Sequence, residues 1–268
     1  MDVVYKFEIT VKDDIEVLIN GHYDTLESTP DDFFEQTIVD NSKYYRINKN
    51  DLEIGYFSLD EEGKLIQFYV IDEMKEDSKT IIEQIIEDYQ CASAIVPTYD
   101  PIYFESIEPF CIEKSIQDNL YILNKKNYDE LEEEEIIVRL ATLEDLDLVV
   151  DLEEKSLDGA TRDGLLIYCK SIIEKKGLYL FFINRSFVGV GESRTWYKKG
   201  STFLCVIVAP KFRSKGIGEF IISYLIKLGL KDNLSILTSA KETSINSNKM
   251  LESLGFENKS QILNMKLK

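Results

Sequence analysis

A succession of short apolar segments occurs twice along this chain of 268 residues, in the same order each time. Each match between the two copies is weak alone, but five in one order indicate a tandem duplication. Two similar domains also suit the length, because single domains usually run to roughly 100–200 residues. The matched segments are 45–49 plus 54–56 with 181–185 plus 188–190, 65–71 with 203–208, 94–98 with 235–238, 105–110 with 252–256, and 120–124 with 261–264.

A strongly acidic segment separates the two copies. Residues 128–135 read Tyr-Asp-Glu-Leu-Glu-Glu-Glu-Glu between apolar runs, which is typical of a linker. We therefore predict a first domain over 1–128, an acidic linker over 129–135 and a second domain over 136–268.

Apolar periodicity in the second domain predicts the order β-α-α-β-β-β-α-β-α-β, which is typical of a mixed α/β fold. The expected helices are 143–157, 165–173, 217–230 and 246–254, and the expected strands are 136–139, 178–183, 187–196, 202–208, 235–238 and 262–267.

Charge is distributed unevenly between the two parts. Residues 1–135 hold 34 acidic and 11 basic side chains, a balance of −23, whereas the other 15 acidic and 20 basic side chains give +5. An acidic domain disfavours nucleic acid and anionic membranes as partners and favours cationic ligands. A solvated surface that aids solubility is the alternative interpretation. With no signal peptide and no apolar run near the roughly 18 residues that span a bilayer, we expect a cytoplasmic protein.

Cysteine and histidine are too sparse to indicate metal chemistry. The cysteines at 91, 111, 169 and 205 form no Cys-x-x-Cys pair, so they are expected to be small buried hydrophobic residues. The single histidine, His22, is expected at the surface or in a loop. We predict no metal site and no Ser-His-Asp triad.

Residues 206–218 carry the clearest chemical signal. An apolar strand ends at Pro210, and Arg-x-x-Gly-x-Gly then opens an amphipathic helix. Gly216 and Gly218 allow close backbone approach, and the start of a helix offers free N–H groups and partial positive charge, which suits a pyrophosphate. Arg213 and Lys215 add full charges. The alternative is a tight strand-to-helix connection, which Gly-x-Gly alone would favour.

This segment resembles the acetyl-CoA signature of the GCN5-related N-acetyltransferases (GNAT), Val-x-Val-x-Pro-x-x-Arg-x-x-Gly-x-Gly. Residues 247–256 resemble the family's second motif, a helix that ends in Gly-Phe, at the family's order and separation. The resemblance covers 136–268, whereas the first half matches only in outline. It implies two tandem GNAT-like domains, each a mixed, mostly antiparallel sheet flanked by helices, with acetyl-CoA as cosubstrate. The implied cofactor-binding residues are Val206, Ile207, Val208, Arg213, Ser214, Lys215, Gly216, Ile217, Gly218, Asn246 and Ser247.

The resemblance also implies that an amine attacks the thioester directly, between two strands that diverge at 203–208 and 235–238. A backbone N–H near Val206 would stabilise the oxyanion. An amine of pKa near 10.4 is only about 0.04% unprotonated at pH 7, so a general base is useful. Glu192 on the preceding strand is the predicted base. The alternatives are that Glu192 is an outward-facing polar residue, or that the base comes from the acidic first half.

Some positions depart from the family pattern. Leu251 stands where many members place a Tyr that protonates the leaving thiolate, and Ser244 stands where a helix-opening Asn is expected. The first half has acidic residues 72–78 in place of the phosphate loop, which predicts no CoA binding there and a role in shaping the acceptor pocket. We expect an N-acetyltransferase for a small-molecule or peptide amine, acting as a monomer or homodimer. The alternative is a non-catalytic acyl-CoA sensor or protein-interaction module.

Overall fold

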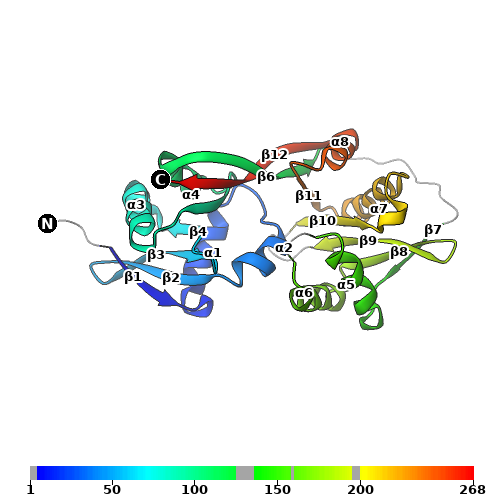
Figure 1. Ribbon diagram of the computed structural model, residues 1–268, viewed down its shortest axis with the longest axis horizontal. Helices are drawn as coiled ribbons and strands as arrows, with labels where there is room; N and C mark the ends of the chain where they lie inside the picture. Colours follow the sequence, from blue (N-terminus) through cyan, green and yellow to red (C-terminus); the bar gives the residue numbers. More distant parts are fainter. Residues whose placement is uncertain (1–4, 125–135, 158–159, 195–199) are drawn as a thin grey trace. The chain divides into compact units, whose positions relative to one another are not determined.

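The computed structural model describes residues 5–124, 136–157, 160–194 and 200–268 (Figure 1). The predicted acidic linker over 129–135 lies outside these residues. The chain forms two compact units: unit 1 comprises Met1–Ser28, Phe34–Asn119 and Ser260–Lys268, and unit 2 comprises Thr29–Phe33 and Leu120–Lys259. These units differ from the two sequence halves, because Thr29–Phe33 belongs to unit 2 and Ser260–Lys268 belongs to unit 1.

Unit 1 is a mixed sheet with helices on both faces. Its strand order is β1-β2-β3-β4-β5-β12-β6. The pairs β1–β2, β2–β3 and β3–β4 are antiparallel, and β4–β5 is parallel. Phe57, Phe68 and Val70 pack in one core with α3 and α4, whereas Tyr56 and Tyr69 contact His22 of α1. The strands are β1 (Tyr5–Thr10), β2 (Lys43–Lys49), β3 (Leu52–Leu59), β4 (Leu65–Val70), β5 (Ser93–Pro97), β6 (Cys111–Leu123) and β12 (Phe256–Leu267). The helices are α1 (Glu16–Thr25), α3 (Ser78–Tyr89) and α4 (Pro101–Ile107), while α2 (Asp32–Phe34) crosses the boundary between the units.

Unit 2 has the same plan, with strand order β6-β11-β10-β9-β8-β7. Helix α7 packs against one face through Ile221 and Leu225, and α5 and α6 cover the other face, where Val190 and Ile207 point (Figure 1). The strands are β7 (Ile136–Leu140), β8 (Leu178–Ile183), β9 (Ser186–Arg194), β10 (Ser201–Val208) and β11 (Ser235–Lys241). The helices are α5 (Leu146–Glu154), α6 (Arg162–Glu174), α7 (Ile217–Lys231) and α8 (Ile245–Ser253). The predicted fold class, a mixed and mostly antiparallel sheet flanked by helices, is confirmed.

Each unit has a glycine at a close contact between two of its own strands, and the two glycines occupy corresponding positions. Gly55 lies opposite Val70 in unit 1, and Gly189 lies opposite Val208 in unit 2. A Cβ at Gly55 would lie 2.1 Å from the carbonyl oxygen of the neighbouring strand, and a Cβ at Gly189 would lie 2.5 Å from its counterpart. Only glycine fits such an approach, so both units require it at corresponding positions.

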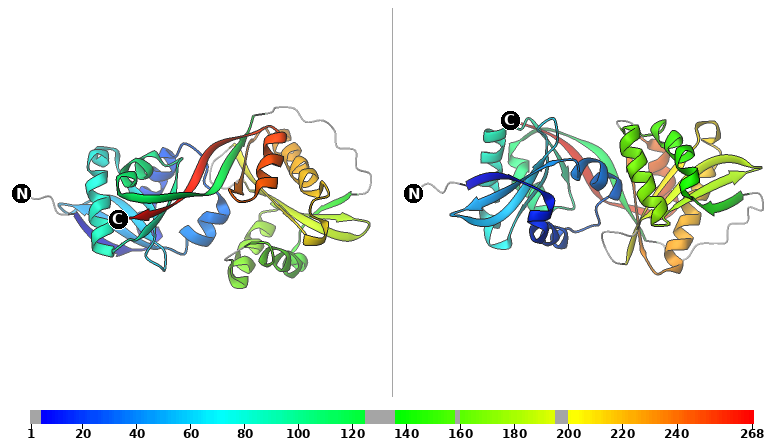
Figure 2. Two further views of the ribbon diagram at one scale, coloured as in Figure 1. Left: turned by 45° about the horizontal axis from the view of Figure 1, so that its top comes forward. Right: turned by 90° about the horizontal axis from the view of Figure 1, so that it is seen from below.

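The last strand is longer than predicted, and its residues from Ser260 onward belong to unit 1. It begins at Phe256 rather than at 262, and Ile262–Lys266 pair antiparallel with β5. In unit 1, β12 therefore lies between β5 and β6, and Figure 2 shows β6 and β12 side by side. Leu263, Met265 and Leu267 are buried in the core of unit 1.

His22 is buried, so its prediction as a surface or loop residue is wrong. It is 2% exposed and lies in α1. Its Nδ1 is 2.6 Å from the hydroxyl of Tyr56, and its Nε2 is 2.7 Å from Oδ2 of Asp100. The ring also stacks on Tyr69, with centroids 5.2 Å apart. Two partners distant in sequence thus satisfy both ring nitrogens, which permits burial of a polar ring.

The four cysteines are free, as expected, but only two of them are buried. Cys91 and Cys169 are buried, whereas Cys111 and Cys205 are partly exposed.

Across the described ranges, no three His, Cys, Asp or Glu side chains are grouped so as to hold a metal ion. Every helix in those ranges is too short or too polar to cross a bilayer.

Candidate active site

The central strands of unit 2 stop pairing part of the way along their length. β10 and β11 pair in parallel from Ser201 opposite Ser235 to Leu204 opposite Thr238. In the described part of the chain that pairing ends there, although β10 continues to Val208 and β11 to Lys241. On its other side, β10 stays paired with β9 up to Val208. The backbone groups of the predicted residues Val206, Ile207 and Val208 that face β11 are therefore available to an extended ligand.

The connection from β10 to α7 leaves the start of the helix open. Gly216 is the N-cap residue and has φ +79°, a left-handed conformation that favours glycine. A Cβ there would meet nothing within 4 Å, so the backbone conformation requires glycine and packing does not. Among the described residues, no side chain caps this helix, and the amides of its first turn are free to bind an anion. Ile217 is buried and anchors the turn, whereas Ser214 is exposed beside it.

The basic residues of this connection have different roles. Arg213 donates from Nε to the carbonyl oxygen of Val208 at 3.0 Å and from Nη2 to Oγ of Ser156 at 3.1 Å. Its guanidinium therefore ties the connection to the end of β10. Lys215 is exposed, with its ammonium 5.6 Å from the centre of the Phe212 ring. Lys215 is thus the freer of the two predicted cations to meet a phosphate.

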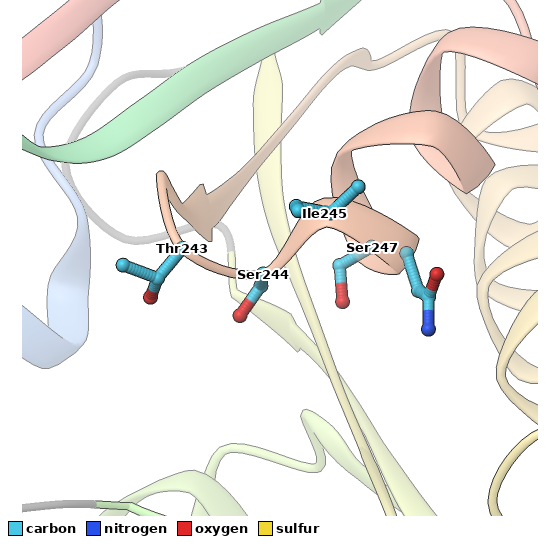
Figure 3. Close-up of a pocket in the computed structure, with 5 residues that line it drawn as sticks. Thr243, Ser244, Ile245 and Ser247 are labelled. Atoms are coloured by element: carbon cyan, nitrogen blue, oxygen red, sulfur yellow. The ribbon is translucent and has the colours of Figure 1, made fainter.

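A pocket of about 470 Å³ lies at the connection from β11 to α8 and the first turn of α8 (Figure 3). Figure 3 shows the hydroxyl groups of Ser244 and Ser247 pointing to the same side, away from Ile245. The connection is held by Asn248, whose amide donates to the carbonyl oxygens of Lys241 at 2.9 Å and Ser244 at 3.0 Å. The pocket is lined by Thr243, Ser244, Ile245 and the predicted residues Asn246 and Ser247.

Glu192 is buried at 1% exposure, so the alternative of an outward-facing residue is wrong. It lies on β9 opposite Cys205 of β10. Tyr168 of α6 donates its hydroxyl to Oε2 of Glu192 at 2.9 Å. Burial raises the pKa of Tyr168 well above its ordinary value, so its hydroxyl keeps the proton that it donates. The Glu192 carboxylate is thereby fixed on the face of the sheet that α5 and α6 cover.

Arg194 provides the positive charge beside Glu192. It is 2% exposed, and its Nη1 donates to the hydroxyl of Tyr168 at 2.6 Å. The same Nη1 lies 3.1 Å from Oδ1 of Asp31, and Nε lies 3.6 Å from Oε2 of Glu192. A buried cation thus sits between two carboxylates.

A second buried carboxyl group, Glu153 of α5, lies beside this network. It is fully buried, and Oε2 accepts the weak S–H donor of Cys169 at 3.2 Å. Its Oε1 has no hydrogen-bond partner among the described residues. Burial raises the pKa of Glu153 well above its ordinary value, and the nearby charge of Glu192 raises it further. Burial and the neighbouring Glu192 therefore both favour the protonated form of Glu153.

The raised pKa of Glu153 makes the stability of the protein depend on pH. The pKa of Glu153 is higher in the folded chain than in the unfolded chain, so its contribution is fully present below about pH 4.5 and is lost as pH rises toward the folded value. We expect Glu153→Gln to gain about 1.4 kcal/mol of unfolding free energy per pH unit relative to wild type above pH 5. Urea unfolding at several pH values measures this difference.

Glu154→Gln is the matched control, because Glu154 is the next residue of α5 and its side chain is 41% exposed. Its stability should follow wild type across the same pH range. If the curves of Glu153→Gln and wild type run parallel, Glu153 is ionised in the folded protein.

Sequence reasoning missed four residues of this network. Arg194 lies two residues after Glu192 on one strand, so both share a face, and this charged pair in an apolar strand was a usable signal. Tyr168, Glu153 and Asp31 come from other elements and carry no local signal.

Both parts of the chain match known families. Residues 11–126 match a family described as "Acetyltransferase (GNAT) domain", and residues 146–256 match one described as "Acetyltransferase (GNAT) family". The chain therefore belongs to the GNAT family, with two GNAT domains in tandem, and is an acyltransferase.

Solved structures show the same tandem fold. A GNAT-family acetyltransferase from Colwellia psychrerythraea aligns with a TM-score of 0.88 at 21% identity, over 98% of this chain and 100% of that one. A tandem GNAT protein from the clavulanic acid biosynthesis pathway aligns with a TM-score of 0.66 at 10% identity, over 98% of each chain. A GCN5-related N-acetyltransferase from Sphaerobacter thermophilus gives 0.65 at 13% identity, over 98% of this chain and 95% of that one. A search of curated proteins finds no match.

Proposed function

We propose that this protein transfers an acetyl group from acetyl-CoA to the primary amine of a small molecule or peptide, by direct attack on the thioester. The observation that carries the proposal is the end of β10–β11 pairing at Leu204 and Thr238, followed by the uncapped start of α7 at Gly216. The divergent strands suit the pantetheine arm, and the free amides suit the pyrophosphate.

Unit 1 supports the assignment of CoA to unit 2. The segment after β4 is a short helix over Asp72–Asp77, which has no glycine and carries four acidic residues and one basic residue. One of those acids, Asp77, is already paired with Lys49, its Oδ2 lying 2.6 Å from Nζ. Negative charge at this place would repel a phosphate.

The geometry of unit 2 supports the proposed cofactor contacts. The backbone of Val206, Ile207 and Val208 would pair with the pantetheine arm, and an N–H near Val206 would face the developing oxyanion. The pyrophosphate would lie on the amides of 213–218. Asn246 and Ser247 line the adjoining pocket and would contact the same cofactor.

Glu192 would act as the general base that takes a proton from the acceptor amine. Its carboxylate is held by Tyr168, and β10 itself carries no carboxylate. We expect Glu192→Gln to lower kcat by about 10²–10⁴, the usual contribution of a general base, with the KM for acetyl-CoA nearly unchanged. Steady-state kinetics measure both constants, and an equal kcat in both proteins would remove Glu192 from the mechanism.

The acceptor would be cationic before it is deprotonated. The acidic first half of the chain favours such molecules, including polyamines, aminoglycosides, amino sugars and lysine-bearing peptides.

We place the enzyme in the cytoplasm, as a monomer or homodimer, without nucleic acid or membrane as partner.

Two measurements test the proposal in sequence. Acetyl-CoA is titrated calorimetrically into the protein, and thiol release is then followed over a panel of the four amine classes. Binding with thiol release for any amine supports the proposal, and absence of binding contradicts it. Tight binding without turnover would support the alternative, an acyl-CoA sensor, which is favoured by Leu251 at the position of the family's acid.

A further inference from the structure

A short segment of the first sequence half supplies a carboxylate to unit 2. Thr29–Phe33 belongs to unit 2, although it lies inside the residues matched by the first GNAT domain. Oγ1 of Thr29 lies 3.4 Å from Oγ of Ser201, and the ring of Phe33 contacts the ring of Tyr168 edge to face, with centroids 5.1 Å apart. Asp31 of this segment contacts both β9 and β11.

Asp31 lies where β10 and β11 begin to diverge. Its Oδ2 accepts a hydrogen bond from the hydroxyl of Ser239 at 3.1 Å, and Ser239 is the first residue of β11 beyond the paired part. Its Oδ1 accepts the N–H of Phe33 at 2.9 Å and lies 3.1 Å from Nη1 of Arg194. Asp31 is therefore fixed by contacts to its own segment, to β11 and to β9.

Arg194 forms an ion pair with Glu192 but no hydrogen bond. Its Nε lies 3.6 Å from Oε2 of Glu192, beyond hydrogen-bond distance, and makes no hydrogen bond to any described residue. A guanidinium readily forms two parallel hydrogen bonds with a carboxylate, and such pairs are strong when buried. The polar contacts that hold Arg194 in its present place go to Asp31 and Tyr168, and its guanidinium also lies over the ring of Phe203, 5.1 Å from the ring centre.

We propose that Asp31 is a positioning residue for Glu192, because it binds Arg194 and so keeps the guanidinium from closing onto the Glu192 carboxylate. This inference rests on the proposed role of Glu192 as base. A carboxylate engaged in a bidentate ion pair is a poor proton acceptor, since protonation would break the pair. The N-terminal sequence thus supplies a side chain that keeps the base in the C-terminal unit free.

The test compares Asp31→Asn with Glu27→Gln, a control that removes the same charge from an exposed position four residues earlier. In crystals of Asp31→Asn, we expect the distance from Arg194 to Glu192 to fall from 3.6 Å to hydrogen-bond range. With any amine that wild type acetylates, we expect kcat to fall at least ~10-fold, a part of the usual contribution of a general base. The Kd and KM for acetyl-CoA should stay within ~2-fold, and Asp31→Glu should restore part of kcat. Glu27→Gln should match wild type.

A double-mutant cycle of Asp31→Asn and Arg194→Gln is the second test of the proposal. If Asp31 acts through Arg194, Asp31→Asn has little further effect on kcat in an Arg194→Gln background. Equal losses in both backgrounds, or an unchanged Arg194–Glu192 distance in Asp31→Asn, would overturn the proposal. If wild type acetylates no amine, or Arg194→Gln does not fold, the crystallographic distance decides the positioning role alone. The failure of the proposed function is thereby told apart from the failure of this inference.

Discussion

Gly218→Glu is expected to abolish acetyl-CoA binding while leaving the protein folded. Gly218 is the second residue of α7, beside the free amides assigned to the pyrophosphate. A carboxylate there would compete for those amides and repel the phosphates, so we expect Kd to rise at least ~100-fold, about 2.7 kcal/mol. A Cβ at Gly218 would lie 3.5 Å from Cγ2 of Val208 and 3.9 Å from the sulfur of Met250, which are ordinary contacts.

The same substitution should not destabilise the fold. Glutamate has a higher helix propensity than glycine by about 0.5–1 kcal/mol, and an acid in the first turn is favourable to the helix dipole. Calorimetric titration with acetyl-CoA and a thermal melt of the same sample separate the two effects. Lys79→Glu is the matched control, at the second residue of α3 in unit 1, and should bind acetyl-CoA as wild type does. Retained binding in Gly218→Glu would place the cofactor elsewhere.

His22→Leu is expected to cost about 2–6 kcal/mol of unfolding free energy, because it takes a hydrogen-bond partner from two buried polar groups, at about 1–3 kcal/mol each. His22 and Asp100 are each 2% exposed, and their side chains are joined at 2.7 Å. Without the imidazole, the Asp100 carboxylate keeps the N–H of Tyr103 at 3.2 Å as its remaining donor within the described residues. The hydroxyl of Tyr56 also loses its contact to His22 at 2.6 Å and keeps the longer hydrogen bond that it donates to Oε1 of Gln67 at 3.4 Å.

Urea unfolding at pH 7 measures this loss, and His22→Gln is the conservative comparison. The amide of glutamine both donates and accepts, so part of the network persists and the loss should be smaller. A loss below ~1 kcal/mol in His22→Leu would show that Asp100 and Tyr56 find other partners, because a buried group left unsatisfied costs about 1–3 kcal/mol.

The sequence predicted those elements whose apolar periodicity is regular. The strands around Gly189 and the helix after Gly216 appear within a few residues of the predicted bounds. Helix α1 was missed because its pattern is irregular: Val17 is 85% exposed, whereas the polar His22 is buried. The extra residues of β12, 256–261, precede the part that pairs with β5, and the other neighbour of β12 in the sheet is β6. They were missed because no local pattern encodes pairing with so distant a strand.

The residues of the candidate site also fall into those that could be predicted from local sequence and those that could not. The segment from Val206 to Gly218 was recognisable because its geometry is local: a strand, a turn with Gly216 at positive φ, and a helix start. The partners of Glu192 were not, because Asp31, Glu153 and Tyr168 reach it only through the tertiary fold. Identifying a buried charge from sequence requires knowing its partner, and such partners come from distant elements.

The membership of Ser260–Lys268 in unit 1 sets an order of events during synthesis. Until these residues leave the ribosome, β5 has no β12 beside it and stands as an unprotected sheet edge. All of the polypeptide from β6 to β12 must be translated first, which takes roughly 10–30 s at ordinary elongation rates. The N-terminal domain, although made first, is therefore completed last, and a nascent chain stalled after unit 2 would carry an unfinished first domain.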